Sequence, residues 1–301
     1  MIVQAFPFFH VFLNPSIYLK MSLEDIRKYY LDSLSSVYPP KEIKSLFLIA
    51  AEYALGMNRM QIRQRMSKNT SPEAEKKMLA ILSRLKKTEP IQYITGTSHF
   101  YDLEIFVTPD VLIPRQETEL LVDMVLRENP GNQNISIIDL CTGSGCIALA
   151  LAKNLSRARM AAMDISEKAL SIAGKNAREY HINLDLMQDD LLNPAARYGQ
   201  YDLIVSNPPY VRASEKFFMH DNILLWEPES ALFVSDDQPM IFYEAIIEFA
   251  TDHLAQEGKI YLEINEAMGN DLASLYTKNS FRNVEICKDL SGKDRYLKCS
   301  N

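Results

Sequence analysis

The chain has 301 residues, of which 47% are apolar, and its formal net charge is −7. This length allows one large domain or two ordinary ones around a sizeable buried core, and no apolar run reaches the roughly 20 residues that a membrane-spanning helix needs. The histidines are scattered and the cysteines include no two pairs at ligand spacing, so we predict no metal site.

The first 20 residues are apolar and aromatic, and no basic residue precedes Lys20. They lack the basic start of a secretion signal, so we expect a cytoplasmic protein with reduced thiols and no membrane association. Met21 offers a second start, and the Ser22-Leu23-Glu24-Asp25 after it is typical of a helix capping box. We predict that residues 1–20 are a translated leader and not part of the native protein.

The charge is distributed unevenly along the chain. Residues 21–90 carry 13 basic against 8 acidic side chains, whereas residues 91–301 carry 18 against 31. An acidic main part argues against a protein that wraps a phosphate backbone, so we predict no direct nucleic-acid partner. A merely solvated surface is the alternative interpretation.

Residues 21–88 place apolar side chains at helical spacing and predict a small helical domain. From its excess of basic side chains, we expect this domain to take part in substrate recognition. Four helices are predicted: one from Ser22, one from Pro39-Pro40 to Gly56, a short one within 58–66, and one from the cap Ser71 to about Lys87. The next segment, 89–113, is rich in β-branched and aromatic residues with Gly96 and Pro109 as punctuation, which predicts a β-hairpin linker.

From Pro114 onward, helix and strand patterns alternate, which implies a doubly wound, mostly parallel sheet. The predicted strands are short apolar runs at 135–140, 158–165, 183–190, 201–207, 259–264, 283–289 and 294–299. The predicted helices are 116–128, 146–154, 167–180, 240–256 and 268–279. The last two strands form a hairpin, which supplies a reversed final strand.

The first of these strands ends at Asp139 and leads into a loop of small residues, Thr142-Gly143-Ser144-Gly145, before a helix that begins at about Cys146. A strand-to-helix turn of this kind lets backbone approach a ligand, and the helix start offers unpaired N–H groups. The loop lacks the third glycine of the dinucleotide fingerprint. We therefore favour a nucleoside with a methionine zwitterion over a pyrophosphate, and a tight turn without ligand is the alternative.

Acidic residues follow the next two strands. Asp164 ends the second strand, where an ionised carboxylate accepts both hydroxyls of a ribose, and Asp189-Asp190 ends the third, where Asp190 is placed to accept from an adenine amino group. Each aspartate alone is more typical of a cap or a loop. Three strand-end acids in series favour a nucleoside site.

The fourth strand runs into Asn207-Pro208-Pro209-Tyr210, at the sheet edge where ligands of open α/β sheets bind. An amide nitrogen is a poor nucleophile because its lone pair is delocalised into the carbonyl. The Asn207 side chain and the Pro208 backbone supply two carbonyl acceptors for the two N–H bonds of such a group. Pro209 stiffens the turn, and Tyr210 offers a flat face to a planar amide or base. A structural turn is the alternative.

These residues resemble those of the protein-(glutamine-N5) methyltransferases that modify peptide chain release factors, and the resemblance covers about residues 22–299. It is carried by FVTPDVLIPRQETELLVD (106–123), IDLCTGSGCIALALA (138–152), YDLIVSNPPYV (201–211), WEPESAL (226–232) and SGKDRYL (291–297). The resemblance implies an α/β fold at 114–301, a Rossmann-like class I methyltransferase domain whose seven-stranded mixed sheet has its last strand antiparallel. A helical N-terminal bundle and a hairpin linker precede it.

The same resemblance assigns roles. S-adenosylmethionine is held by Thr142, Gly143, Ser144, Gly145, Asp164, Asp190 and Asn207. The catalytic residues are Asn207, Pro208 and Tyr210, and together with Pro209 they grip the glutamine of a Gly-Gly-Gln loop. Pro114, Arg115 and Glu117 lie over the active site or simply start a helix, and Trp226 either walls the substrate slot or belongs to the core. A monomer is expected.

The chain departs from the family pattern at three places. Cys141 stands where the family usually has glycine, Gln116 where it has a second proline, and the INEAMG at 264–269 lacks a glycine and a glutamine. We interpret these changes as lineage drift, with Cys141 tightening the pocket around the methionine end of the cofactor.

Two rival functions share the motif or the fold. An adenine-N6 or guanine-N2 methyltransferase of DNA or RNA uses the same Asn-Pro-Pro-aromatic clamp, but it must flip a base and grip the flanking backbone, which needs a basic groove. A non-catalytic binding module is the other rival, and the intact clamp at 207–210 argues against it.

Overall fold

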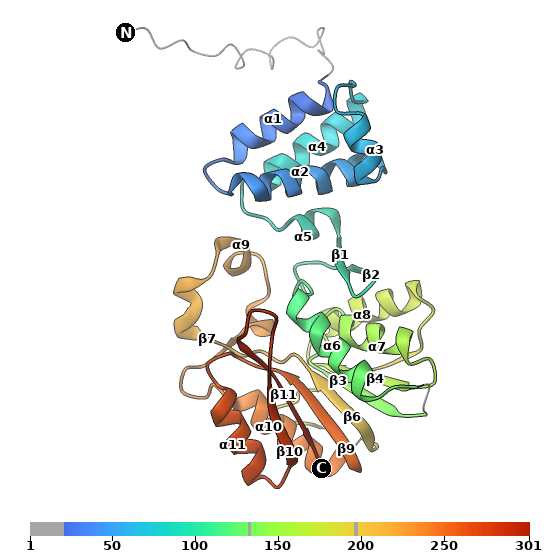
Figure 1. Cartoon of the computed structure of the whole chain (residues 1–301), viewed down its shortest axis with the longest axis vertical. Helices are drawn as coiled ribbons and strands as arrows, with labels where there is room; N and C mark the ends of the chain where they lie inside the picture. Colours follow the sequence, from blue (N-terminus) through green and yellow to red (C-terminus); the bar gives the residue numbers. More distant parts are fainter. Residues whose placement is uncertain (1–20, 132–133, 196–197) are drawn as a thin grey trace. The chain divides into compact units, whose positions relative to one another are not determined.

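The computed structural model describes residues 21–131, 134–195 and 198–301, and the described chain forms two compact units that meet between Thr95 and Gly96 (Figure 1). The leader predicted at residues 1–20 lies outside the described residues. Within the described ranges, no helix is long and apolar enough to cross a bilayer.

The first unit is helical, as predicted. Its elements are α1 (Leu23–Leu34), α2 (Pro40–Leu55), α3 (Arg59–Gln64), α4 (Pro72–Leu85) and α5 (Ile91–Thr95). The predicted capping box is present, since Ser22 accepts from the backbone N–H of Asp25 and the Asp25 side chain accepts from that of Ser22. Gly56 ends α2 in the left-handed conformation, which costs glycine little.

Tyrosine and phenylalanine side chains organise the core of this unit. Tyr30 is fully buried, packs edge-to-face on Phe47 at 5.7 Å between ring centroids, and donates its hydroxyl to the carbonyl oxygen of Met78 at 2.6 Å. The hydroxyl therefore enters the core without an unmatched hydrogen bond. Helices α1, α2 and α4 are fastened together by these contacts.

The segment predicted as a hairpin linker is only partly a hairpin. Strands β1 (Thr97–Phe100) and β2 (Leu103–Phe106) pair antiparallel around a turn whose two central residues, Tyr101 and Asp102, have positive φ. The prediction was wrong for Ile91–Thr95, which is the helix α5. Its apolar residues suggested a strand by composition, but they pack into the helical core of the first unit.

The second unit is built on the predicted seven-stranded sheet (Figure 1). Its strands are β3 (Ser136–Leu140), β4 (Arg159–Asp164), β5 (Leu184–Gln188), β6 (Tyr201–Ser206), β9 (Leu254–Glu263), β10 (Arg282–Lys288) and β11 (Asp294–Ser300). They lie in the order β10-β11-β9-β6-β3-β4-β5. The last strand, β11, is antiparallel to both neighbours, which confirms the predicted mixed sheet.

Five longer helices cover the sheet. They are α6 (Gln116–Glu128), α7 (Cys146–Asn154), α8 (Glu167–Glu179), α10 (Ile241–His253) and α11 (Gly269–Lys278). Figure 1 shows α6, α7 and α8 on one side of the sheet and α10 and α11 on the other. Apolar residues of α10 and α11 pack with the buried sheet residues into one continuous core.

A long insertion between β6 and α10 was not resolved into elements by sequence patterns. It contains β7 (Val211–Arg212), the 3-10 helix η2 (Ala213–Phe218), α9 (Asp221–Leu224), the 3-10 helix η3 (Glu229–Ala231) and β8 (Phe233–Val234). Strands β7 and β8 pair in parallel. The insertion begins directly after the Asn207–Tyr210 motif and is therefore anchored at the predicted site.

A buried carboxylate, that of Asp139, holds the β3–α7 loop in place through hydrogen bonds. Asp139 precedes the last strand residue, Leu140, and does not itself end the strand. One oxygen of Asp139 accepts from the Thr142 hydroxyl at 2.6 Å and from the Ala148 N–H at 3.3 Å, while the other oxygen is buried and has no partner among the described residues. Burial raises the pKa of Asp139 to about 7.

Replacing Asp139 by Asn should change how stability depends on pH. Because the folded pKa exceeds the ordinary value of 3.8, the folded protein holds this proton more tightly than the unfolded chain, and the resulting stability is lost as the pH rises through about 7. Asn stays neutral. Urea unfolding should show the mutant gaining stability relative to the wild type between about pH 4 and about pH 7, with no further gain above that range, and a constant difference would contradict this.

Candidate active site

Parallel register brings the predicted site residues to one edge of the sheet. Leu140 of β3 pairs with Met163 of β4 and with Ser206 of β6, so the chain leaves these strands side by side. The Ser206 hydroxyl donates to the carbonyl oxygen of Leu140 at 2.6 Å, and the Asp189 N–H donates to that of Asp164 at 3.2 Å. The small-residue loop, the strand-end acids and the Asn-Pro-Pro-Tyr motif therefore share this edge.

The side chains of the small-residue loop point into the protein. Thr142 donates its hydroxyl to Asp139, and Ser144 is 2% exposed. The backbone N–H of Thr142 donates to Met163 O, and that of Gly145 donates to Thr142 O. Both side chains are thus buried, which leaves the backbone of the loop as the part that a ligand can approach.

The two loop glycines have different reasons to be glycine. Both have positive φ, but a Cβ on Gly145 would lie 3.0 Å from the Cβ of Ala173 in α8, whereas a Cβ on Gly143 would meet nothing within 4 Å. Gly145 thus allows close helix packing, and Gly143 borders open space where a ligand can approach. Cys141 also has positive φ, at 59°, which explains why glycine suits that position.

Asp164 joins the loop to the start of α8. Its two oxygens accept from the backbone N–H groups of Gly143 and Ser166, each at 2.9 Å. Burial raises the pKa of Asp164, and these backbone hydrogen bonds act against that shift by favouring the ionised form. Each carboxylate oxygen has a second lone pair, so the group can still accept from a diol.

Asp189 and Asp190 follow β5, and they differ in how they are used. The Asp189 carboxylate accepts from the Ala195 N–H and the Tyr198 hydroxyl, which closes the local loop. Asp190 accepts from the Leu192 N–H at 3.0 Å through one oxygen. Asp189 is therefore occupied by its own loop, and Asp190 is the better placed of the two for a ligand.

The Asn-Pro-Pro-Tyr motif has no regular secondary structure, and two of its carbonyl oxygens have no donor among the described residues. Among the residues that the structure describes, none donates a hydrogen bond to Oδ1 of Asn207 or to the carbonyl oxygen of Pro208. The Asn207 amide instead donates from Nδ2 to Oγ1 of Thr118 at 3.0 Å. The carbonyl oxygen of Tyr210, by contrast, has a donor, because Nδ2 of Asn265 donates to it at 3.2 Å.

These residues border a small pocket of about 50 Å³, which is room for a few water molecules. Its lining residues come from the α6 start, the motif, the insertion and the end of β9, and they are Leu112, Arg115, Asn207, Pro208, Tyr210, Val211, Ala231, Leu232 and Glu263. Polar and apolar groups thus meet at the strand edge.

Two distant motifs of the sequence meet at this pocket through an ion pair. Arg115, the residue before α6, pairs with Glu227 of the insertion at 2.6 Å, and Glu227 also accepts from the Ile113 N–H at 3.2 Å. Two further residues were named from the sequence. The Glu117 side chain is exposed, whereas Trp226 is half-buried and therefore does not belong to the core. Sequence reasoning had not singled out Glu227, although it stands in the quoted WEPESAL stretch.

Sequence reasoning also missed Thr118 and Glu263, which lie behind the motif. Thr118 is 2% exposed and Glu263 is 1% exposed, and they are joined by a hydrogen bond of 2.7 Å. Glu263 is the last residue of β9, so it continues the series of strand-end acids that already pointed to this edge. That series was the available signal.

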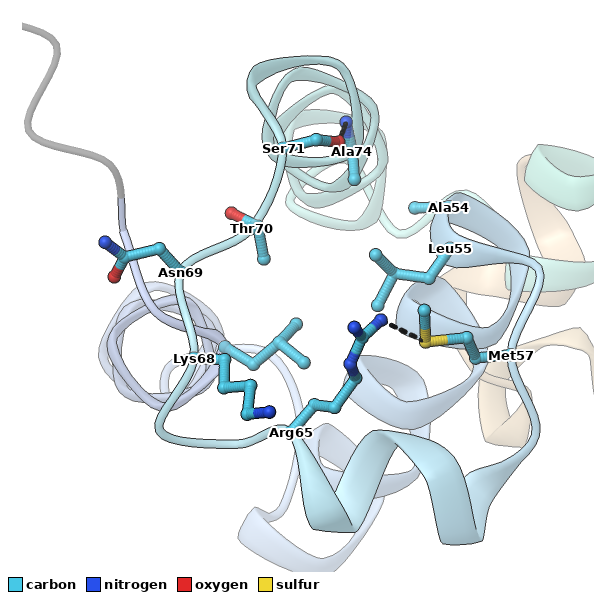
Figure 2. Close-up of a pocket in the computed structure, with 10 residues that line it drawn as sticks. Ala54, Leu55, Met57, Arg65, Lys68, Asn69, Thr70, Ser71 and Ala74 are labelled. Carbon is cyan, nitrogen blue, oxygen red and sulfur yellow. Dashed lines mark hydrogen bonds between the residues drawn. The ribbon is translucent and has the colours of Figure 1, made fainter.

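A larger hollow of about 330 Å³ lies in the helical unit (Figure 2). It is lined by Leu23, Ala54, Leu55, Met57, Arg65, Lys68, Asn69, Thr70, Ser71 and Ala74. Figure 2 shows the Arg65 side chain turned toward Met57, whose sulfur accepts from it at 3.6 Å. Its lining offers two cations and no carboxylate, so it does not share the chemistry of the strand edge.

Comparison with known proteins identifies the family. Two family models match: the methyltransferase small domain over residues 116–232 and the PrmC N-terminal domain over residues 33–96. A release factor glutamine methyltransferase of Bacteroides thetaiotaomicron is 43% identical over 90% of this chain and 98% of that protein. One of Flavobacterium psychrophilum is 38% identical over 92% of this chain and 99% of that protein.

Solved structures agree with the fold. A methyltransferase from Pyrococcus furiosus matches with a TM-score of 0.50 at 17% identity, over 72% of this chain and 96% of that one. The hMettl16 catalytic domain, solved with an RNA hairpin, matches with a TM-score of 0.52 at 16% identity, over 77% and 81%. The mixed sheet is that of a methyltransferase, and full-length sequence similarity goes further: the chain belongs to the release factor glutamine methyltransferase family.

Proposed function

We propose that this protein transfers a methyl group from S-adenosylmethionine to the side-chain amide nitrogen of the glutamine in the Gly-Gly-Gln loop of peptide chain release factors. The names of its relatives support this substrate. One structural observation carries the chemistry: Asn207 Oδ1 and Pro208 O, two carbonyl oxygens to which no residue of the described ranges donates, belong to residues that line one pocket.

The residues of the strand edge fit the proposed cofactor. Gly143 faces open space, which leaves room for a ligand against the loop backbone. The Asp164 carboxylate suits the ribose diol and Asp190 the adenine amino group, because both groups are acceptors when ionised. Thr142 and Ser144 contribute through the backbone, since their side chains face inward. When bound, S-adenosylmethionine supplies a methyl group already activated on a sulfonium.

The motif then has to prepare a weak nucleophile. Asn207 Oδ1 and Pro208 O would each accept one N–H of the substrate amide, which localises the nitrogen lone pair and aims it. Pro208 and Pro209 are buried, so the turn that holds the second acceptor is rigid. Alignment and exclusion of water supply most of the catalysis, worth up to roughly 7–11 kcal/mol in well-oriented reactions.

Nucleic acid is not favoured as the substrate. The relatives are named for release factors, and residues 91–301 carry 31 acidic against 18 basic side chains. At the pocket, the one arginine of the lining, Arg115, is already paired with Glu227. A phosphate backbone would therefore find little positive charge near the motif.

A protein substrate fits an exposed aromatic pair beside the site. Phe217 and Phe218 on η2 are 93% and 88% exposed. The helix η2 is tied to the motif by Asn265, whose Nδ2 donates to the carbonyl oxygen of Tyr210 and to the Glu215 carboxylate at 3.1 Å. We propose that the body of the release factor covers these rings when its loop enters the pocket.

We also propose that the helical part, residues 21–88, recognises the release factor, while residues 89–113 link it to the methyltransferase domain at 114–301. Residues 21–90 have an excess of basic side chains, and the larger hollow is bordered by the exposed Arg65 and Lys68. These cations suit acidic side chains on a partner.

The proposed function has a direct test. Purified protein is incubated with S-adenosylmethionine and, in separate reactions, a release factor, a release factor with the loop glutamine changed to alanine, duplex DNA and ribosomal RNA. Mass spectrometry should show one added methyl on the loop glutamine of the first substrate alone. Methylation of a nucleic acid, with none on the release factor, would reject the proposal.

Two substitutions should separate substrate alignment from cofactor binding. Asn207→Ala removes one amide acceptor, so turnover should fall on the order of 100-fold or more while the Kd for the cofactor stays near that of the wild type. Asp164→Ala removes a charged acceptor, so the Kd should rise on the order of 10- to 100-fold. Calorimetry and steady-state rates measure both, and normal turnover in the Asn207 variant would refute its role.

The aromatic pair should matter for a whole protein and not for a short peptide. Changing Phe217 and Phe218 to Ser should raise the KM for an intact release factor by about 10-fold or more, since each buried ring is worth roughly 1.5–3 kcal/mol. The KM for a short Gly-Gly-Gln peptide should stay unchanged. Leu290→Ser is the control, because Leu290 is 90% exposed and lies outside the insertion, in the β10–β11 turn. An equal effect in the control would contradict the assignment.

A further inference from the structure

A chain of hydrogen bonds, buried at Glu263 and Thr118, runs from the end of β9 to the motif. The Glu263 carboxylate accepts from the Thr118 hydroxyl at 2.7 Å through Oε2 and from the Tyr210 hydroxyl at 2.9 Å through Oε1. The Thr118 oxygen in turn accepts from Nδ2 of Asn207 at 3.0 Å. Thr118 and the two motif residues Asn207 and Tyr210 are thus connected through one carboxylate.

Counting the available protons shows which group donates in each of these hydrogen bonds. An ionised carboxylate only accepts, so Thr118 must donate its single hydroxyl proton to Glu263. The Thr118 oxygen can then only accept from Asn207, which must present its NH2 side to Thr118. The carbonyl oxygen of the same amide is therefore left on the other side, where no described residue donates to it.

The direction matters because an amide has two nearly equal shapes. Rotating the Asn207 side-chain amide by half a turn exchanges its oxygen and its NH2 with almost no change in volume. In the rotated form, an NH2 group would meet the substrate NH2, and two donors cannot form a hydrogen bond. Packing alone does not distinguish the two orientations, so a polar partner is needed.

We propose that Glu263 and Thr118 are positioning residues that lock Asn207 with its carbonyl oxygen toward the substrate amide. This inference rests on the proposed function, since it assumes that Asn207 Oδ1 receives the substrate N–H. The same carboxylate fixes Tyr210 at the other side of the motif. Neither Glu263 nor Thr118 needs to touch the reacting atoms.

Two hydroxyl donors and one nearby cation favour the ionised form of Glu263 against the effect of its burial. Burial raises its pKa, but the hydrogen bonds from Thr118 and Tyr210 and the positive charge of Arg295 act in the opposite direction, while Glu117 adds a smaller repulsion. Arg295 itself is held by ion pairs with Asp289 and Glu266. The hydroxyls of Thr118 and Tyr210 both donate to Glu263, as the proposed orientation of Asn207 requires.

The test replaces Thr118, the residue in the middle of this chain of hydrogen bonds. Thr118→Val keeps the shape but removes the hydroxyl, so kcat should fall on the order of 10-fold, with the cofactor Kd near wild type and a lower urea midpoint, because the buried Glu263 carboxylate loses one donor. Thr118→Ser restores the hydroxyl and should restore most of kcat. Thr251→Val controls for removing a threonine hydroxyl from a helix, because the exposed Thr251 donates to a backbone carbonyl one turn away and has no described contact with the motif.

A double-mutant cycle separates positioning from packing. In the Asn207→Ala background, Thr118→Val should cause no further loss of kcat, because no amide remains to be oriented. Glu263→Gln should lower kcat as Thr118→Val does, since the Gln amide can donate to Thr118 and reverse the donor direction of the hydrogen bonds. These readouts depend on the orientation of Asn207 and not on general stability.

Three results would overturn the inference while leaving the proposed function intact: wild-type kcat in Thr118→Val, equal loss in the Val and Ser variants, or an additive loss in the Asn207→Ala background. If the wild-type protein transferred no methyl to a release factor, the proposed function itself would fail. The two failures are therefore distinguishable in one set of assays.

Discussion

The parallel register of β3, β4 and β6 is the constraint on which the site depends. Leu140 lies level with Met163 and Ser206, so the loop after β3, the acid that ends β4 and the motif after β6 all emerge at one edge. The buried Ser206 hydroxyl secures this alignment by donating to Leu140 O. Because successive residues of a strand point to opposite faces, a slip of one residue would turn these groups away from each other.

Buried carboxylates then fix the loops at this edge. Asp139, Asp164 and Glu263 each have a raised pKa because burial disfavours their charge, and each is held by hydrogen bonds from hydroxyl or backbone N–H donors. Such groups are costly to bury unless they are paired, so their presence at one edge indicates that precise geometry is selected there. Asp139 holds the β3–α7 loop, Asp164 connects that loop to the start of α8, and Glu263 holds the Asn-Pro-Pro-Tyr motif, each through hydrogen bonds.

The fold was largely predictable because periodicity and turn chemistry are local. Helices α6 and α7 were predicted with the bounds that the structure shows, and the strand alternation gave the mixed sheet. The helix Ile91–Thr95 was missed, since a short apolar run does not distinguish helix from strand. The insertion at 211–234 was missed because elements of two to six residues have no period to detect.

The site was predictable only in part, for a different reason. Strand-end position predicted Asp164, Asp190 and Asn207, and the parallel pairing of their strands places these residues at the same end of the sheet. Side-chain direction is decided by packing, so sequence could not show that Thr142 and Ser144 face inward. Partnerships across long separations, such as Thr118 with Glu263, likewise leave no local pattern.

The central claim is that two carbonyl oxygens hold the substrate amide at the tip of β6. A crystal structure with a Gly-Gly-Gln peptide and S-adenosylhomocysteine tests it most directly. We expect the glutamine nitrogen to lie about 2.9 Å from both Asn207 Oδ1 and Pro208 O, on the line toward the cofactor sulfur. An amide bound elsewhere, or facing Nδ2 of Asn207, would contradict the account.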